Sequence, residues 1–245
     1  MKRMVKRVAS VSLAAAVAAT AGSQALAVGW QPSRTQNEVE VVESVVSTGI
    51  GAQVAVTAGP SINPATGSIL QVQQSQDAVI QVTPVSQTLA VNNAINAANP
   101  GLSAGQLSAN PTASGLSYAA NGQLNNLYNQ VTNAESTEQL LETTAPAAAA
   151  TFETTVGAPA SEYAPIALYD VAASASAEAV IAESGSAQVA ISVPGVADGT
   201  QVVAICWDRN GNSRTVPVRV VNGVVYLTVY SSGPVMIMAR TQVQG

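Results

Sequence analysis

The sequence predicts an α+β chain that is mainly β, with a small helical middle and an antiparallel β-sandwich in its C-terminal part. Three observations support this class. Short runs in which polar and apolar residues alternate occur towards both ends of the chain. The middle of the chain instead spaces apolar residues three and four apart, as helices do. Two Asn-Gly pairs, Asn210-Gly211 and Asn222-Gly223, indicate tight turns between strand-like runs near the C-terminal end.

Residues 1–27 have the pattern of a secretory signal peptide. Basic residues come first, residues 8–21 are mainly apolar, and Ala25, Leu26 and Ala27 form a small-x-small cleavage site. The apolar stretch is shorter than the roughly 20 residues that span a bilayer. We therefore expect cleavage after Ala27, with Ala25 and Ala27 as the recognition residues, and a secreted, extracellular product without a membrane attachment.

The charge balance of the mature chain excludes several functions. After residue 27 the sequence holds five arginines, no lysine, no histidine and fourteen acidic residues, a net charge of −9. Histidine bases, lysine nucleophiles and histidine metal ligands are therefore absent, and binding to nucleic acid or to an anionic membrane is disfavoured. Cys206 is the single cysteine, so no intramolecular disulfide forms. We expect no cofactor and no metal.

Residues 28–84 are predicted to be extended. Valines at 41–42 and 45–46 adjoin an acidic patch, and residues 53–57 alternate polar and small apolar side chains. Residues 69–73 and 78–83 do the same and are predicted to form a hairpin.

Residues 85–144 are predicted to be helical. Ser86 caps a first segment, and Asn121 caps a second one whose apolar residues share one helix face. Ser103-x-x-Gln106 and Ser136-x-x-Gln139 fit the capping-box pattern. Residues 145–162, rich in Ala, Pro, Thr and Ser, are predicted to be a linker or surface loop.

The segment 163–241 carries the clearest strand pattern, and residues 176–183 in it fit either a helix or a strand. Treating both Asn-Gly pairs as two-residue turns pairs Val220 with Val225 and Ile205 with Val216. This register turns Cys206 outward and leaves Pro217 as a bulge. The predicted strands are 166–172, 187–193, 201–207, 214–221, 224–230 and 235–239. The predicted core face is Val203, Ile205, Trp207, Val216, Val218, Val220, Val225, Leu227 and Val229.

The same segment resembles a C-terminal, immunoglobulin-like β-sandwich module of secreted and cell-surface proteins of Gram-positive bacteria. The residues that carry the resemblance are 192–196, Gly199, 202–203, Trp207, 222–223 and 232–235. They form turns and strand entries, so the resemblance implies a fold and an extracellular location but transfers no catalytic residue.

One outward strand face is a candidate ligand-binding surface. It carries Tyr226, Thr228 and Tyr230, with Arg219 opposite Tyr226, and tyrosines beside a hydrogen-bond donor stack on sugar rings. The same residues also suit an ordinary half-buried strand. Asp208, Asn210 and Asn212 have the opening spacing of a calcium loop, but Arg219 stands where a bidentate glutamate is needed, and a hairpin explains them better.

The sequence favours a non-enzymatic, extracellular structural or interaction module. Its expected partner is an extracellular protein, a glycan or a second copy of the chain. The alternatives are a carbohydrate-binding sandwich and, as the less favoured one, a hydrolase whose acid and base are both carboxylates. The carboxylates available for such a hydrolase are Glu138, Glu142, Glu153, Glu162, Asp170 and Glu178.

Overall fold

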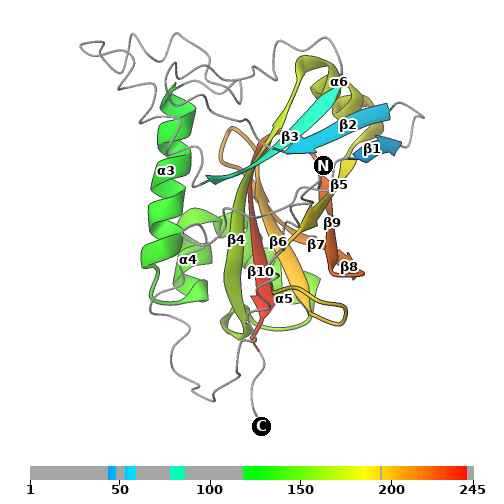
Figure 1. The fold of residues 1–245 in the computed structure, drawn as a ribbon. Coiled ribbons are helices and arrows are strands. Elements are labelled where there is room, and N and C mark those ends of the chain that lie inside the picture. Colours follow the sequence, from blue (N-terminus) through cyan, green and yellow to red (C-terminus); the bar gives the residue numbers. More distant parts are fainter. Residues whose placement is uncertain (1–43, 48–52, 59–77, 86–117, 194, 242–245) are drawn as a thin grey trace, which may run out of the picture.

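The computed structural model describes residues 44–47, 53–58, 78–85, 118–193 and 195–241, and these form two β-sheets with helices against them (Figure 1). The α+β class is confirmed. No helix within the described ranges is both long and apolar enough to cross a membrane.

The larger sheet has seven strands, in the order β1-β2-β3-β4-β10-β6-β7. Strands β2 and β3 are parallel to each other, and the other neighbours are antiparallel. The sheet joins strands that lie on both sides of the helical middle in the sequence. Their bounds are β1 Ser44–Ser47, β2 Gln53–Ala58, β3 Val79–Pro84, β4 Tyr163–Ala173, β6 Val202–Trp207, β7 Ser213–Pro217 and β10 Gly233–Arg240.

The smaller sheet has three antiparallel strands, β5 (Ala187–Ser192), β9 (Val224–Val229) and β8 (Arg219–Val221), in that order. Its apolar face and one face of the larger sheet enclose the first hydrophobic core. Helix α6 (Ala175–Ser184) closes this core with Ala177 and Ile181.

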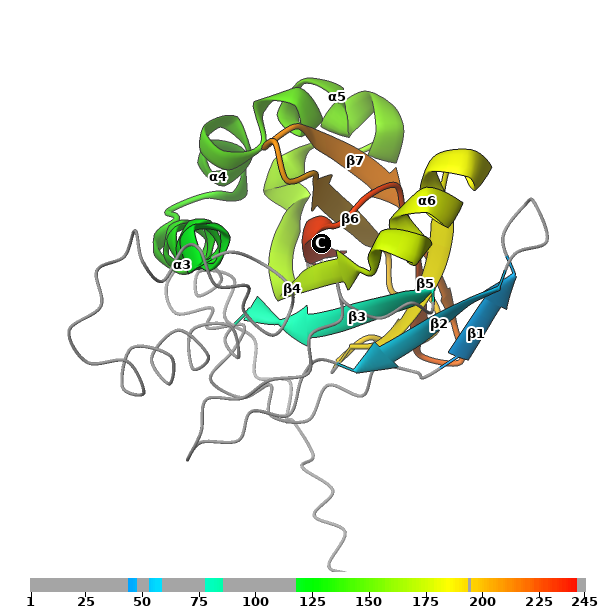
Figure 2. The same cartoon turned by 90° about the horizontal axis from the view of Figure 1, so that it is seen from above.

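The second core lies on the other face of the larger sheet, beneath three helices and a short 3-10 turn (Figure 2). Trp207 anchors these helices, because its Nε1 donates to the carbonyl oxygen of Thr144 at 2.7 Å. Central strands such as β6 are therefore buried on both faces. The elements are α3 Tyr118–Asn133, α4 Thr137–Thr144, α5 Pro146–Val156 and η2 Ala160–Glu162.

Several local predictions for the middle of the chain are tested by these elements. The Ser136 cap is confirmed, since its side chain accepts from the amide of Gln139 at 3.2 Å. The Asn121 cap is wrong, because α3 begins at Tyr118. Most of the predicted linker is a helix, α5, and the ambiguous segment 176–183 belongs to helix α6. The pattern at 69–73 and the caps at Ser86 and Ser103 lie outside the described residues.

The segment 163–241 does not form a clear immunoglobulin-like sandwich. Its strands divide between the two sheets, and β4 pairs with β3 from the N-terminal region. Pro217 is not a bulge inside one strand. It ends β7, and the chain then passes into β8 of the other sheet.

The predicted hairpin registers are half right. Asn222 and Gly223 have φ angles of 52° and 74°, as a type I′ turn requires, and Val220 pairs with Val225. At the other hairpin the pairing is shifted by one residue, so that Ile205 pairs with Thr215. The amide of Gly211 donates to the carbonyl oxygen of Asp208, and Gly211 has φ 86°. The loop is thus a three-residue turn with a left-handed glycine, not a two-residue turn.

The register shift divides the predicted single core face between two cores. Val203, Ile205 and Trp207 face the helices. Val216, Val225, Leu227 and Val229 face the core between the sheets, with Val218 and Val220 against it. Cys206, predicted to point outward, is buried in that same core.

Candidate functional site

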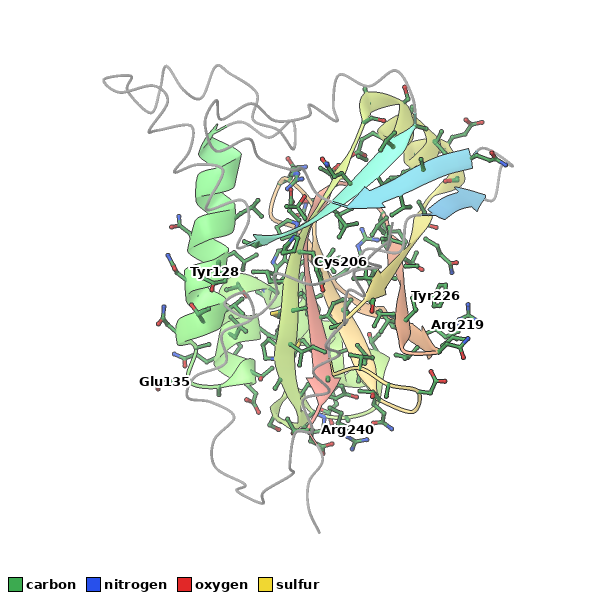
Figure 3. All side chains as sticks on the ribbon, in the orientation of Figure 1. Tyr128, Glu135, Cys206, Arg219, Tyr226 and Arg240 are labelled. Carbon is green, nitrogen blue, oxygen red and sulfur yellow. The ribbon has the colours of Figure 1, made fainter. Side chains whose placement is uncertain are left out.

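Three of the four predicted ligand residues, Arg219, Tyr226 and Thr228, lie on strands β8 and β9 of the three-stranded sheet, and Tyr230 follows β9 directly. Since Val225 and Leu227 point into the core, the alternate residues Tyr226 and Thr228 point away from it. Tyr226 and Thr228 are partly exposed, and Tyr230, just beyond β9, has 40% of its surface exposed. Figure 3 places Tyr226 beside Arg219 at the rim of the molecule.

Each of the two tyrosines is covered on one side by an arginine. The Cζ atom of Arg219 lies 4.9 Å from the centroid of the Tyr226 ring, and the predicted pairing of these residues is confirmed. The Cζ atom of Arg214 lies 4.4 Å from the centroid of the Tyr230 ring. Both distances are those of cation–π contacts. The molecule therefore has two arginine–tyrosine stacks, one between β8 and β9 and one between β7 and the end of β9, of which the sequence indicated only the first.

A polar pocket of about 400 Å³ adjoins the second stack. It lies among the β6–β7 hairpin, helix α6 and the turn between β9 and β10. Among the residues that line it are Glu178, Cys206, Arg209, Arg214, Tyr230 and Ser232. The pocket thus includes both residues of the second stack, Arg214 and Tyr230.

A buried ion pair lies beneath this pocket. Asp170, in the middle of β4, has no exposed side-chain surface, and Arg209 of the hairpin loop reaches it. The Nη1 and Nη2 atoms donate to the two carboxylate oxygens at 2.6 and 3.2 Å, and Nη2 also donates to the carbonyl oxygen of Val171 at 3.1 Å. This bidentate geometry fixes the guanidinium against β4.

The ion pair was missed from the sequence, although a signal for it is present. Asp170 is the one charged residue in an otherwise apolar run, 166–172. Aspartate is almost never fully buried without a partner, so its position alone indicates that an arginine lies nearby.

The remaining wall of the pocket is held by hydrogen bonds to Ser232. Its hydroxyl oxygen accepts from the amide of Ala173 at 2.8 Å, and its own amide donates to Oε1 of Glu178 at 3.0 Å. The second bond fixes the Glu178 carboxylate at the rim of the pocket.

Cys206 does not have the properties of a nucleophile. Burial raises the pKa of its thiol to about 12, although the charge of Arg214 acts in the opposite direction. The thiol is therefore protonated at neutral pH, and a protonated thiol is a poor nucleophile and a poor metal ligand.

The candidate calcium loop is an ordinary hairpin loop. Oδ1 of Asp208 accepts from the amides of Asn210 and Asn212 at 2.8 and 2.9 Å, and Oδ2 accepts from Nδ2 of Asn212 at 2.7 Å. These bonds, the one from the Asn212 side chain foremost, lower the pKa of Asp208. Within the described ranges, no group of three or more His, Cys, Asp or Glu residues is arranged to hold a metal ion.

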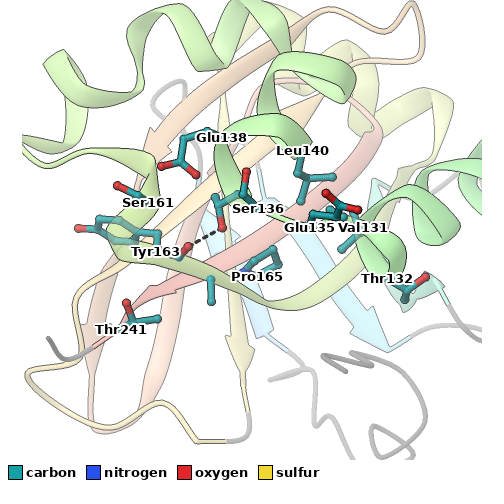
Figure 4. Close-up of a pocket in the computed structure, with 13 residues that line it drawn as sticks. Val131, Thr132, Glu135, Ser136, Glu138, Leu140, Ser161, Tyr163, Pro165 and Thr241 are labelled. Atoms are coloured by element: carbon teal, nitrogen blue, oxygen red, sulfur yellow. Dashed lines mark hydrogen bonds between the residues drawn. The ribbon is translucent and has the colours of Figure 1, made fainter. Parts of the chain in front are cut away.

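The helical side of the molecule has a second pocket, of about 380 Å³, where α3 and α4 meet β4 (Figure 4). Glu135 and Glu138 line it, and the hydroxyl of Thr137 donates to the carbonyl oxygen of Tyr163 at 2.6 Å beside them. Glu142 does not join this pocket and is exposed on α4.

Among the carboxylates considered for a hydrolase, three are engaged in interactions within the protein. Asp170 pairs with Arg209, Glu162 pairs with Arg240, and Glu178 accepts from Ser232. Glu138 lines the helical-side pocket and Glu178 lines the polar pocket, so these two do not form a catalytic pair.

Comparison with known proteins adds no relative to this description: no family model, no curated protein and no solved structure matches the chain.

Proposed function

We propose that the chain is a secreted, non-enzymatic interaction module that binds carbohydrate through the outer face of the three-stranded sheet. The observation that carries this proposal is the presence of two arginine–tyrosine stacks along and beyond β9, Arg219 on Tyr226 and Arg214 on Tyr230. The absence of histidine and lysine from the mature sequence and the raised pKa of the Cys206 thiol support a role without catalysis.

The chemistry of the stacks suits sugar rings. An aromatic ring offers an apolar surface to the C–H groups of a sugar, and a guanidinium offers several N–H donors to its hydroxyl oxygens. Tyr226 and Tyr230 are four residues apart, which is about 13 Å in an extended strand. Because each tyrosine ring already rests against an arginine, its side chain loses little conformational entropy when a ligand binds.

A glycan array probed with labelled residues 28–245 tests the proposal. We expect binding to a limited set of glycans, lost in the double variant Tyr226→Ala/Tyr230→Ala and weakened in Arg219→Gln. Tyr128→Ala, which removes a tyrosine from α3, is the matched control and should bind as the parent does. Equal binding by the double variant, or no glycan bound by the parent, would contradict carbohydrate recognition by this face.

A structural role through self-association is the second candidate. It is supported by the position of β1 (Ser44–Ser47), which is the terminal strand of the larger sheet and has one edge to which no strand of the described residues pairs. Such edges pair readily with other chains. Light scattering coupled to size exclusion over a hundredfold concentration range separates the candidates. Oligomers that grow with concentration and persist in Cys206→Ser support assembly, and a constant monomer excludes it.

A further inference from the structure

The polar pocket between α6 and the β6–β7 hairpin carries charges of both signs. Arg209 and Arg214 bring positive charge, while Glu178 and Asp208 bring negative charge. A wall of mixed charge is unusual in a mature chain that has only five cations.

Two of these four charged groups are already neutralised or fully bonded within the protein. Arg209 is held by the buried carboxylate of Asp170. Asp208 accepts three hydrogen bonds from its own loop. The charge of Arg209 is therefore compensated, and Asp208, although still charged, already has both carboxylate oxygens occupied by donors of its own loop.

The other two charged groups are positioned but not satisfied. The guanidinium of Arg214 lies over the Tyr230 ring and makes no ion pair with any residue in the described part of the chain. Glu178 is fixed through Oε1 by the amide of Ser232, and its Oε2 has no hydrogen-bond donor among the described residues. The pocket thus offers a ligand one fixed cation and one fixed anion.

We propose that this pocket binds a free α-amino acid in its zwitterionic form. The ligand carboxylate accepts hydrogen bonds from Arg214, and the ligand ammonium donates to Oε2 of Glu178. A ligand with only a negative charge meets Glu178 and the net charge of −9, and a ligand with only a positive charge meets Arg214. Only a zwitterion pairs with both Arg214 and Glu178. Purely anionic and purely cationic ligands are each disfavoured by repulsion from the side chain of like charge.

The size and lining of the pocket define the amino acid further. About 400 Å³ exceeds the volume of the charged backbone groups, which leaves room for a side chain. Val229, Val235 and Cys206 line part of the wall. Because the two available charges are taken by the ligand backbone, the side chain is neutral.

This inference goes beyond the carbohydrate proposal, with which it shares Arg214 and Tyr230. Tyr226 and Arg219 do not line the pocket, and Glu178 comes from α6 rather than from the strands that bear the stacks. Because Glu178 belongs only to the pocket and Arg219 only to the outer face, substituting each of them distinguishes failure of one proposal from failure of the other.

Calorimetric titration of residues 28–245 with leucine and with glutamine is the first test. We expect at least one of the two to bind saturably. For that amino acid, the N-acetyl derivative lacks the positive charge and the methyl ester lacks the negative charge. Each should bind the unaltered protein at least tenfold more weakly than the zwitterion.

Variants then test which protein side chain binds each charge of the ligand. Glu178→Gln should weaken the zwitterion at least tenfold without weakening the N-acetyl derivative, and Arg214→Gln should weaken the zwitterion without weakening the methyl ester. Glu183→Gln on the same helix and Arg219→Gln in the other stack are matched controls that leave the affinity unchanged. The proposal is overturned if neither amino acid binds, or if the N-acetyl derivative binds as tightly as the zwitterion. The comparison of the zwitterion with its two derivatives uses the unaltered protein. It therefore tests the proposal even if one of the variants fails to fold.

Discussion

At the scale of single residues, Asp170 shows how strongly one buried charge constrains its surroundings. A carboxylate without exposed surface is stable only if a cation and hydrogen-bond donors reach it. Arg209 supplies both from a hairpin loop. The Arg209 side chain keeps 28% of its surface exposed. Without its partner Arg209 could still be solvated by water, whereas Asp170 without its partner would be a buried, unpaired charge.

The two halves of this pair should therefore differ when they are substituted. Arg209→Met leaves Asp170 charged and buried, and we expect it to lower the free energy of unfolding by about 3–5 kcal/mol. Asp170→Asn leaves an arginine that can turn towards water, and we expect a loss of about 2 kcal/mol. Urea unfolding at neutral pH measures both values. The reverse order would show that the carboxylate is not the buried partner.

Cys206 gives a prediction about alkaline pH. Its thiol has a pKa of about 12 in the folded protein and 9.0 as the ordinary value, so between these values the folded chain holds a proton that the unfolded chain releases. Rising pH therefore favours unfolding in this range, by up to about 1.4 kcal/mol per pH unit. Between pH 8 and 10.5 the parent should lose about 2 kcal/mol more than Cys206→Ala does. Equal losses in denaturant titrations at the two pH values would show that this thiol does not titrate as inferred.

At the scale of elements, the start of β10 is fitted tightly against the end of β6. A Cβ atom added at Gly233 would lie 1.9 Å from the carbonyl oxygen of Trp207 and 2.8 Å from its carbonyl carbon. Both obstacles are backbone atoms of a central strand, which cannot move without breaking sheet hydrogen bonds. This close approach explains why glycine stands at the entry of the strand.

Gly233→Ala should consequently destabilise the protein by about 3 kcal/mol or more. Gly185→Ala is the control: that glycine has φ 81° but no atom within 4 Å of the added Cβ, so only backbone strain of about 1–2 kcal/mol is expected. Thermal unfolding of both variants measures the difference. A smaller effect at Gly233 than at Gly185 would rule out the close approach.

The elements also show what the sequence can and cannot predict. Most strands after residue 162 were predicted within a few residues, because glycine and asparagine mark their ends. The inward face of β9 was also predicted, but the division of β6 between two cores was not, since β6 is buried on both sides and alternation then carries no information. Helix α5 was missed because its Ala- and Thr-rich sequence also suits a loop, and because its packing against β7 depends on residues such as Ser213 and Thr215 far along the chain.

The candidate site follows the same division. The Arg219–Tyr226 stack joins adjacent strands through an Asn-Gly turn, so it was predictable from local sequence. The Arg214–Tyr230 stack joins β7 of one sheet to the end of β9 of the other. The Asp170–Arg209 pair spans 39 positions. The sequence around Asp170 indicates that a cation lies nearby, but which arginine it is, and which tyrosine Arg214 contacts, depend on the tertiary arrangement of the strands.

At the scale of the whole molecule, the arginines are few and held in regular or bonded segments. Between Arg34 and Arg209 the chain has no lysine or arginine. Arg209 is bound to Asp170, while Arg214 and Arg219 lie within β7 and β8. Trypsin needs an accessible bond after a basic residue that can enter its active site in an extended form. Bonds within paired strands are not free to do so.

We therefore expect trypsin to leave the bonds after Arg209, Arg214 and Arg219 intact in the folded protein for hours. In urea the same enzyme should release residues 35–209 as one fragment, identified by mass spectrometry. A glutamate-specific protease, whose sites are spread over the chain, serves as the control in urea. Rapid cleavage after Arg209 in the folded protein would contradict the burial of its ion pair.

The three-residue loop at 209–211 restricts which insertions and deletions the protein can accept. Surface loops normally accept the gain or loss of a codon. Here a one-residue deletion would convert the turn to a two-residue one, and every side chain of β7 would then exchange its inside and outside positions. The same event would withdraw Arg209 from Asp170 and Arg214 from Tyr230. A length change that would be silent in most hairpins should thus abolish folding and both candidate sites together, so the number of residues in this loop is under tighter constraint than their identity.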